Sequence, residues 1–425
     1  MLKKFTLSIL GTLLSASLVL GSGFSIYEQG AKATAMGGAF IAQANDASAM
    51  FYNPAGIINL KGTHIGTGVT IIMPQASFTG PTKDDPNLYT AAEKQVFPPV
   101  HFYATQQINE NLSFGFSFYT LFGLGSKWPG DWAGRTLATT SDVQTFALNP
   151  AMAVRLADNL SIAVGMTYMI GNVILEKSIY TGYETDTYIE SKLDAKGNGV
   201  GVNLGIQYKP VDRLTLGAIY RDNIMLDFED GDATFIIPQL QNQSIYQALV
   251  GYFPNTKGSS ELELPDMFGL GIAFDFTDQI TAEFDYMSLG WSSYDQLTVK
   301  FDDPVAGSKE TVSHKNYKDS YSLRFGLEYR YSEQLAIRAG YLRDNHAVPD
   351  EHLEPSLPEG DRDLYSFGIG YKMGSMTFDG FYMLLTQDDR TVQTSELEVN
   401  GQPFPFNGKY EAIGHLFGLS FGYSF

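Results

Sequence analysis

Basic side chains within weakly charged stretches are the residues with which this sequence could do chemistry. Arg221, Arg324 and Arg338 each stand in a segment that alternates apolar residues with small or polar ones. A guanidinium in such a place can hold a carboxylate through two parallel hydrogen bonds. We therefore predict that these three residues are candidate contacts for an anionic ligand. An ion pair with a neighbouring acid, such as Glu328 with Arg324, is the alternative.

Two other stretches are unusually rich in large apolar residues for segments that we interpret as loops. Their main members are Phe122, Leu124, Trp128 and Trp132 in the first, and Phe235, Ile236, Ile237, Tyr246 and Phe253 in the second. Large exposed apolar patches normally mark an interaction site. We predict that both stretches capture a hydrophobic ligand. Loops that pack only on one another are the alternative.

Several kinds of chemistry are excluded or disfavoured. The chain has no cysteine, and its six histidines are scattered, so we expect no metal, no cofactor and no thiol nucleophile. The stretch 418–422 matches the G-x-S-x-G pattern, but that mechanism needs a strand-to-helix turn and this segment alternates as a strand. The net charge of −19 argues against nucleic acid as a partner. We expect a protein that is not an enzyme.

The N-terminal residues predict export from the cytoplasm. Lys3 and Lys4 precede an uncharged run from Phe5 to Leu20, which the small residue Gly21 follows. A short basic start, an apolar core and a small residue at the cleavage point are typical of a secretory signal peptide. We assign residues 1–21 to such a peptide. A buried N-terminal helix is the alternative.

The elements that must position these side chains alternate with a period of two. Phe114, Phe116 and Phe118 share one face of a segment whose other face carries Ser113 and Ser117. The same pattern recurs over residues 160–168, 268–276 and 417–425. Successive side chains of a strand point to opposite faces, so each strand has one apolar face. A soluble β-sandwich would alternate in the same way.

Short turns of similar form favour a membrane barrel over a sandwich. They lie at residues 108–112, 156–160, 210–214, 276–280 and 331–335, with a looser copy at 372–376. Six short turns separated by long connections give 14 strands, and short turns on one rim with long loops on the other are typical of outer-membrane barrels. We predict an all-β fold, a 14-stranded antiparallel transmembrane β-barrel over residues 62–425, in the outer membrane of a Gram-negative bacterium.

Residues 22–61 do not alternate, and small residues such as Gly37, Gly38 and Ala39 are frequent among them. We expect Asp46 to cap a short helix over residues 47–49. Asn53 is expected to cap a second one, with Pro54 at its first position. The few charges and many apolar residues predict a compact hatch that plugs the barrel. A flexible periplasmic tail is the alternative.

Several of these segments together resemble the FadL family of long-chain fatty-acid transporters. They are Gly23–Phe24, residues 35–40, Asn53–Pro54–Ala55–Gly56, the loop motif at 128–135, and Leu357–Pro358 with Asp361–Arg362. They keep the family's order over nearly the whole mature chain. A single Asn-Pro-Ala carries little information, but the set is specific.

The resemblance implies a 14-stranded barrel blocked by an N-terminal hatch, with Asn53, Pro54 and Ala55 as the hatch motif. Members of the family carry long-chain fatty acids or aromatic hydrocarbons across the outer membrane. The resemblance also implies capture between extracellular loops and a pocket near Gly23 and Phe24. It places a basic ligand contact in the region of Lys177 and sideways release where the third strand is kinked.

We therefore predict an outer-membrane transporter for hydrophobic compounds, with long-chain fatty acids first and aromatic hydrocarbons second. An adhesive or structural barrel and a water-filled pore are the alternatives. We expect outer-membrane lipid and lipopolysaccharide as further partners, and a monomer. The sequence leaves open which cation meets a carboxylate.

Overall fold

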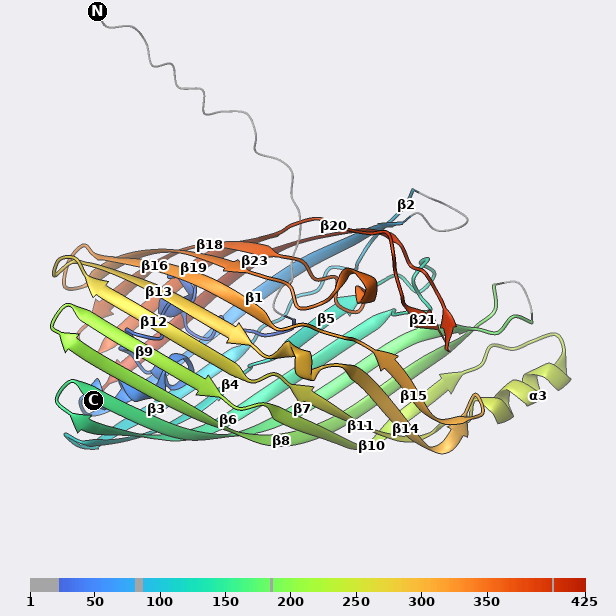
Figure 1. Ribbon diagram of the computed structural model, residues 1–425, viewed down its shortest axis with the longest axis horizontal. Coiled ribbons are helices and arrows are strands. Elements are labelled where there is room, and N and C mark those ends of the chain that lie inside the picture. The colour runs from blue at the N-terminus through green and yellow to red at the C-terminus, as the bar shows by residue number, and fades with distance from the viewer. Residues whose placement is uncertain (1–22, 81–86, 184–185, 400) are drawn as a thin grey trace, which may run out of the picture.

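The computed structural model describes residues 23–80, 87–183, 186–399 and 401–425, and the segment 1–21 assigned to a signal peptide lies outside these ranges. The described chain is mostly antiparallel strand and closes into an elongated barrel (Figure 1). No helix in these ranges is long and apolar enough to cross a membrane. The predicted fold, a closed barrel of 14 antiparallel strands with a hatch at its N-terminus, is confirmed.

Most barrel strands are single elements. They are β1 (Thr63–Gly80), β3 (Val100–Asn109), β6 (Thr140–Ala157), β7 (Leu160–Tyr180), β8 (Tyr188–Val211), β17 (Leu335–Asp344), β18 (Arg362–Met373), β19 (Met376–Gln387) and β23 (Gly408–Ser424). The last strand pairs with the first, from His64 against Ser424 to Thr79 against Lys409. This pairing closes the wall and leaves neither terminal strand as an open edge.

The remaining barrel strands are each made of two consecutive elements. They are β4 (Leu112–Tyr119) with β5 (Gly123–Lys127), β9 (Leu214–Arg221) with β10 (Ile224–Ile236), β11 (Thr256–Leu264) with β12 (Met267–Asp275), β13 (Ile280–Leu289) with β14 (Gln296–Val305), and β15 (Ser308–His314) with β16 (Ser320–Arg330). Sequence periodicity had not indicated these interruptions, because the alternation resumes on both sides of each break.

Short elements lie between or beyond the barrel strands. Those that follow or precede the long connections are β2 (Leu88–Ala91) and β20 (Arg390–Val392) beside the wall, the pair β21 (Glu398–Val399) and β22 (Gln402–Pro403), the helix α3 (Gln243–Tyr252) and the 3₁₀ turn η3 (Asp350–His352), whereas the 3₁₀ turn η2 (Trp291–Ser293) lies in the break between β13 and β14. The six predicted short turns lie at the end opposite the long connections, at the left of Figure 1. The predicted asymmetry of the two rims is therefore confirmed.

Alternation along the strands separates lipid-facing from lumenal side chains. Phe114 and Phe116 of β4 are exposed, whereas Ser113 and Ser117 on either side of this pair are buried. Phe268, Leu270, Ile272 and Phe274 of β12 are likewise exposed on the outer surface. In an outer-membrane barrel this apolar outer face meets lipid, so its exposure to solvent in the isolated chain is expected.

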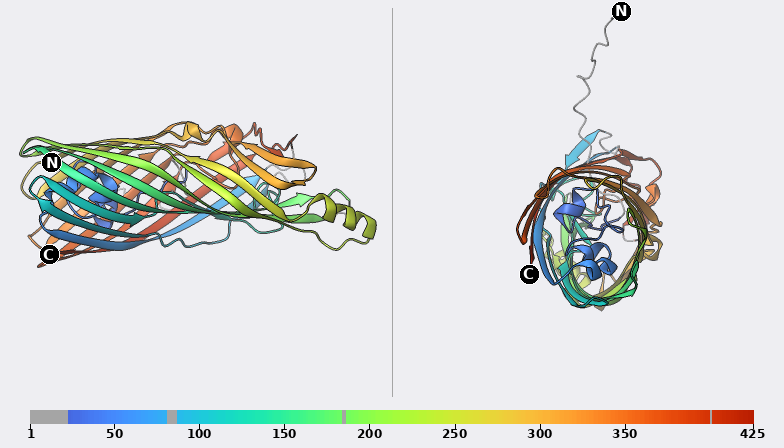
Figure 2. Two further views of the ribbon diagram at one scale, coloured as in Figure 1. Left: turned by 90° about the horizontal axis from the view of Figure 1, so that it is seen from below. Right: turned by 90° about the vertical axis from the view of Figure 1, so that its left-hand side faces the viewer.

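The N-terminal residues fill the lumen at the short-turn end, as the end-on view of Figure 2 shows. They form α1 (Ala31–Thr34), α2 (Ala49–Tyr52) and the 3₁₀ helix η1 (Pro54–Asn59). The expected helix over residues 47–49 is wrong in its start: α2 begins at Ala49, because the Asp46 carboxylate accepts the Ser48 amide at 2.7 Å and closes a turn before it. The predicted boundary at residue 61 stays a prediction, and β1 begins at Thr63.

Two carboxylates of β13 hold the hatch backbone. Asp285 accepts the amides of Phe40 and Ile41 at 2.8 and 3.0 Å. Glu283 accepts the next two amides, those of Ala42 and Gln43, at 2.6 and 3.1 Å. Four consecutive N–H groups that have no partner within a helix or strand are thereby satisfied by the barrel wall.

Candidate functional site

An apolar cavity of about 280 Å³ lies in the half of the barrel beyond the hatch. Side chains from many separate segments line it, among them Phe24, Leu124, Lys177, Phe235 and Phe253. Five residues that the sequence singled out for three different reasons therefore meet in one space. We call this space the outer cavity. Its apolar walls with a few polar groups are typical of small-molecule sites.

Lys177 differs from the other basic groups of the outer cavity because it is not held in an ion pair with a described residue. Burial opposes both charges of the neighbouring pair, yet Glu354 holds the pKa of Lys315 above its ordinary value. In return Lys315 holds the pKa of Glu354 below its own ordinary value. These two groups contact each other as an ion pair and are neutralised. Lys177 is partly buried and makes no ion pair with any described residue.

Lys315 and Glu354 were missed by the sequence reasoning. Lys315 lies in the break between β15 and β16, Glu354 lies in the loop before β18, and both line the outer cavity. A single lysine in a polar stretch does not indicate that its side chain lines a cavity. Only the packing of the two segments brings the charges of Lys315 and Glu354 together.

A second, much smaller pocket of about 30 Å³ lies between the hatch and the barrel wall. Ile26 and Tyr27 of the N-terminal segment, Leu121, Arg221 and Arg324 are among the residues that line it. We call it the inner pocket. The sequence analysis had named both arginines as candidate contacts for an anionic ligand, and each is less than a tenth exposed.

Both guanidiniums of the inner pocket bond uncharged groups of the described chain. Arg221 donates to the Tyr119 hydroxyl at 2.9 Å and to the Phe51 carbonyl. Arg324 lies over the Tyr27 ring at 4.5 Å from its centre and donates to the Ser322 hydroxyl at 3.2 Å. Neither makes an ion pair within the described part of the chain.

Arg338 is in a different position from these two residues. It contacts Glu328 at 2.7 Å and Asp379 at 2.6 Å, so its charge is compensated twice. The expected pair of Glu328 with Arg324 is wrong, because the strand register places Glu328 directly opposite Arg338. Lys32 of the hatch also lies 3.7 Å from Glu328. Arg338 therefore belongs to a network that joins the hatch to the wall.

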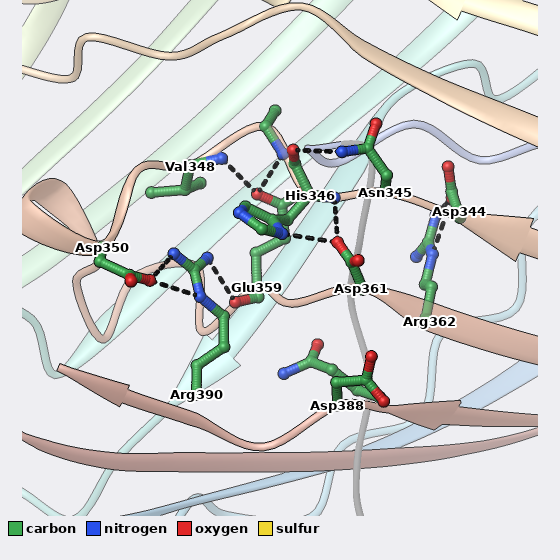
Figure 3. A network of polar contacts seen from close by, with 12 residues as sticks. Asp344, Asn345, His346, Val348, Asp350, Glu359, Asp361, Arg362, Asp388 and Arg390 are labelled. Carbon is green, nitrogen blue, oxygen red and sulfur yellow. Dashed lines mark hydrogen bonds and ion pairs between the residues drawn. The ribbon is translucent and has the colours of Figure 1, made fainter.

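The N-terminal segment separates the two spaces. Phe24 packs against the rings of Trp291 and Phe122 at 4.7 and 6.0 Å. The Gly23 amide donates to Glu359, whose second oxygen accepts the Ala347 and Val348 amides of the outer loop at 3.0 and 2.8 Å (Figure 3). Gly23 has a positive φ of 62°, and a Cβ there would lie 2.3 Å from the Trp291 ring, so glycine is required.

Most residues proposed for capture are covered rather than exposed. Trp128 and Trp132 stack at 4.3 Å and are buried, and Phe122 is buried as well. The Trp128 indole donates to the Pro355 carbonyl at 3.0 Å. These three residues are therefore covered by other parts of the chain, as in the alternative of loops that pack on one another, and their role in capture stays a prediction.

The second apolar stretch forms a small core around α3. Phe253 is buried in it, and Phe235, Ile237 and Tyr246 pack against it. Ile236 points away and is 60% exposed. Because Phe235 and Phe253 also line the outer cavity, this core forms part of the cavity's roof.

The hatch motif attaches the hatch to neighbouring strands. The Asn53 amide donates to the Ile41 carbonyl at 2.8 Å and to the Ile206 carbonyl of β8 at 2.9 Å. Its oxygen accepts the Ala55 amide, and Pro54 begins η1, so the predicted cap is confirmed. The Ala55 carbonyl accepts the Ser161 hydroxyl of β7 at 3.1 Å.

A serine and a histidine meet in the lumen without forming a catalytic triad. His101 Nε2 lies 3.1 Å from Ser420 Oγ, a pair that sequence spacing could not show. The Ser420 hydroxyl also accepts the Ala31 amide of the hatch at 2.9 Å, and His101 Nδ1 has no hydrogen-bond partner among the described groups. A triad needs an acid at that nitrogen to orient the ring. No group of three or more potential metal ligands is present in the described ranges.

The chain matches the family model of outer membrane transport proteins named OMPP1/FadL/TodX over residues 12–425. Outer membrane protein P1 of Haemophilus influenzae is 23% identical, with each chain covered over its full length. A long-chain fatty acid transport protein of an Escherichia coli O6:H1 strain is 24% identical over 90% of this chain and 89% of the relative.

Solved structures show the same fold. A Pseudomonas aeruginosa FadL homologue superposes with a TM-score of 0.82 at 20% identity, covering 97% of this chain and all of that one. The toluene transporter TodX of Pseudomonas putida gives a TM-score of 0.72 at 14% identity, covering 94% and 99%. Relatives with fatty-acid and with hydrocarbon names thus share this architecture.

Proposed function

Since this chain belongs to the OMPP1/FadL/TodX family of outer membrane transport proteins, we propose that its substrates are long-chain fatty acids. Members of this family move hydrophobic small molecules across the outer membrane. The observation that carries the narrower proposal is the set of cations without ion-pair partners among the described residues. Lys177 lies in the outer cavity, and Arg221 and Arg324 line the inner pocket.

The free energy of a buried charge favours an anionic ligand. A cation that leaves water without gaining an anion is strongly destabilising. A hydrocarbon would need no cation in the outer cavity or the inner pocket. A fatty-acid carboxylate would neutralise a cation in each of them. Because Lys315 is already paired with Glu354, Lys177 is the group free to meet the ligand in the outer cavity.

The proposed route runs from the outer loops to the outer cavity and past Phe24 to the inner pocket. The hatch then rearranges and the acyl chain leaves sideways into the membrane. Release into the aqueous periplasm would forfeit about 0.8 kcal/mol for every buried methylene, so a sideways exit keeps the chain in apolar surroundings. The break between β4 and β5, beside the inner pocket, supports an exit at that point.

The test compares oleate with its methyl ester, which has the same chain without the charge. We expect Lys177→Met to weaken oleate binding about tenfold, since a hydrogen bond to a charged group contributes about 1.5–3 kcal/mol. Methyl oleate binding should stay unchanged. The matched control is Lys257→Met, because Lys257 pairs with Asp232 on the exposed surface. Equal losses for both ligands would reject the carboxylate contact.

Two other functions remain as outcomes of defined tests. Uptake of aromatic hydrocarbons is favoured if wild-type protein transports toluene and not oleate. An adhesive or structural barrel is favoured if deletion of the protein leaves the uptake of both unchanged. We further propose that the protein acts as a monomer with lipid and lipopolysaccharide around it and catalyses no reaction. The missing acid at His101 supports the last point.

A further inference from the structure

Three charged side chains lie within the outer cavity. They are Lys177 of β7, Lys315 in the break between β15 and β16, and Glu354 in the loop before β18. Lys315 is buried, and the other two are half-buried. We call these three residues the charge cluster. Two lysines and one glutamate give it a formal charge of +1.

The other charged residues that border the outer cavity lie at its edge. Glu176 and Lys192 stand directly opposite each other on β7 and β8, so their charges offset one another. Lys192 also contacts Asp194 at 3.0 Å, with 41% of its side chain exposed. Glu398 of β21 is exposed. A ligand inside the cavity therefore meets the net positive charge of the charge cluster.

Glu354 is held in place by its neighbours. Its carboxylate accepts the Ser356 hydroxyl at 2.6 Å and contacts Lys315 as an ion pair. The next carbonyl, that of Pro355, accepts the Trp128 indole at 3.0 Å. The carbonyl of Ser356 in turn accepts a hydroxyl of β5, also at 3.0 Å. A carboxylate on a backbone tethered in this way stays beside Lys315 when a ligand enters the cavity.

The carboxylate of Glu354 is also ionised at neutral pH. Burial raises its pKa, but the charge of Lys315 and the hydrogen bonds from Lys315 and Ser356 outweigh this effect and hold the pKa below its ordinary value. Glu354 therefore subtracts a full charge from the two lysines of the charge cluster.

The net charge of the cluster decides which head group it can neutralise. A carboxylate has one negative charge and leaves the cluster neutral. A phosphate monoester carries close to two negative charges above about pH 7, so it leaves an excess negative charge beside Glu354. Like charges repel more strongly in a cavity of low effective dielectric than in water. A doubly charged head group is therefore disfavoured in this cavity.

We propose that Glu354 is a specificity-determining residue that restricts the outer cavity to amphiphiles with a single negative charge. The proposal rests on the proposed function and narrows its substrate class to monoanionic lipids. Doubly charged lipids such as alkyl phosphates are rejected by repulsion from Glu354 rather than by a lack of cations. An added repulsive element of this kind gives specificity against a competitor that has the same chain.

The first test compares oleate with oleyl phosphate, which has the same chain and a doubly charged head group at about pH 8. Displacement of labelled oleate from the full-length protein in detergent measures both affinities. Wild type should prefer oleate about tenfold or more, because placing like charges together is costly. Glu354→Gln raises the charge of the cluster to +2, so the preference should shrink about tenfold. An unchanged preference in a folded Glu354→Gln protein would overturn the proposal.

Asp350→Asn is the matched control. It removes an acid from the same loop that also forms an ion pair, in this case with Arg390, and Asp350 lies outside the described lining of the outer cavity. The preference for oleate should stay at its wild-type value. An equal loss of preference in this control would mean that the loop as a whole, and not the charge of Glu354, sets the selectivity.

A double variant separates charge from packing. Lys315→Met with Glu354→Gln removes both members of the ion pair and leaves the +1 charge of Lys177 in the cluster. Replacing both partners of a buried ion pair is often neutral for stability, so this variant is available even if Glu354→Gln fails to fold. Its preference for oleate should be close to that of wild type. A preference lost in the folded double variant would overturn the proposal.

The two proposals fail in different ways. If wild-type protein binds no oleate, the proposed function fails. If wild-type protein binds oleate and binds oleyl phosphate equally well, the function stands and the role of Glu354 is rejected.

Discussion

Arg324 and Arg338 come from neighbouring strands and face the same lumen, yet their surroundings give them opposite roles. Arg338 holds two carboxylates, whereas Arg324 lies over the Tyr27 ring at the inner pocket. An arginine held in ion pairs stabilises the barrel, and one that makes no ion pair with the described residues is available to a ligand. Sequence position alone could not separate the two residues, because both stand in alternating strands.

This contrast predicts different phenotypes for the same substitution. Arg338→Gln should lower the free energy of unfolding by about 3–5 kcal/mol, because it leaves buried carboxylates without a partner. It should leave the ratio of oleate to methyl oleate affinity unchanged. Arg324→Gln should reduce that ratio and change stability less. Thermal unfolding measures the stability of each variant, and displacement of labelled oleate in detergent measures the affinity ratio. A larger stability loss for Arg324→Gln together with a reduced affinity ratio for Arg338→Gln would contradict the roles assigned to the two arginines.

The outer loop carries a carboxylate whose effect on stability depends on pH. The hydrogen bond from His346 at 2.6 Å lowers the pKa of Asp361 from an ordinary 3.8 to about 2 (Figure 3). A lowered pKa means that the folded state favours the ionised form. The stabilisation is therefore complete above about pH 4 and is lost as the pH falls towards 2.

Asp361→Asn tests this dependence. Near neutral pH the variant should unfold at a lower temperature than wild type, and the difference should shrink between about pH 4 and pH 2 and vanish below about pH 2, where the wild-type carboxyl becomes protonated. Asp388→Asn is the control, because Asp388 also contacts Arg343 but is mostly exposed. A difference that persists unchanged to the lowest pH would show that the carboxylate charge is not responsible.

At the scale of elements, β13 fixes the position of the hatch. Its two lumenal carboxylates accept four consecutive hatch amides. Replacing them by Glu283→Gln and Asp285→Asn keeps the shape but turns one oxygen of each into an NH2 group that cannot accept a hydrogen bond, so at least one of the bonds to the Ala42 and Gln43 amides is lost. We expect amide exchange at residues 40–43 to become several-fold faster, because a buried amide left without a partner costs about 1–3 kcal/mol.

Hydrogen exchange followed by mass spectrometry measures this change. Glu261→Gln is the matched control, since Glu261 is exposed on the outside of the adjoining wall. Faster exchange throughout the barrel, rather than in the hatch alone, would mean that the pair stabilises the wall and not the hatch.

The sequence predicted the elements whose formation depends on residues that are neighbours in the chain. Alternation along β4, β7, β12 and β23 and the six short turns depend on neighbouring residues, and they predicted the barrel. The start of α2 was missed because a single side-chain bond from Asp46 to Ser48 delays it. The pairs Lys315–Glu354 and His101–Ser420 join segments far apart in the chain, so no local sequence pattern could predict these contacts.

At the scale of the whole molecule, the hatch decides whether the barrel is a transporter or a pore. Its residues Met36, Phe40 and Met50 are fully buried in the lumen, but the hatch supplies no strand to the closed wall in the described chain. The barrel should therefore close without the hatch, with a lower unfolding temperature, since buried apolar contacts are lost.

We expect the wild-type protein to be almost silent in planar lipid bilayers. A variant that lacks residues 23–60 should conduct ions steadily, because its lumen is then open to water. A matched variant that shortens the outer loop around α3 should stay silent, as that loop lies at the far end from the hatch. Steady conductance by the wild-type protein, equal to that of the variant without a hatch, would contradict a plugged transporter and favour a water-filled pore.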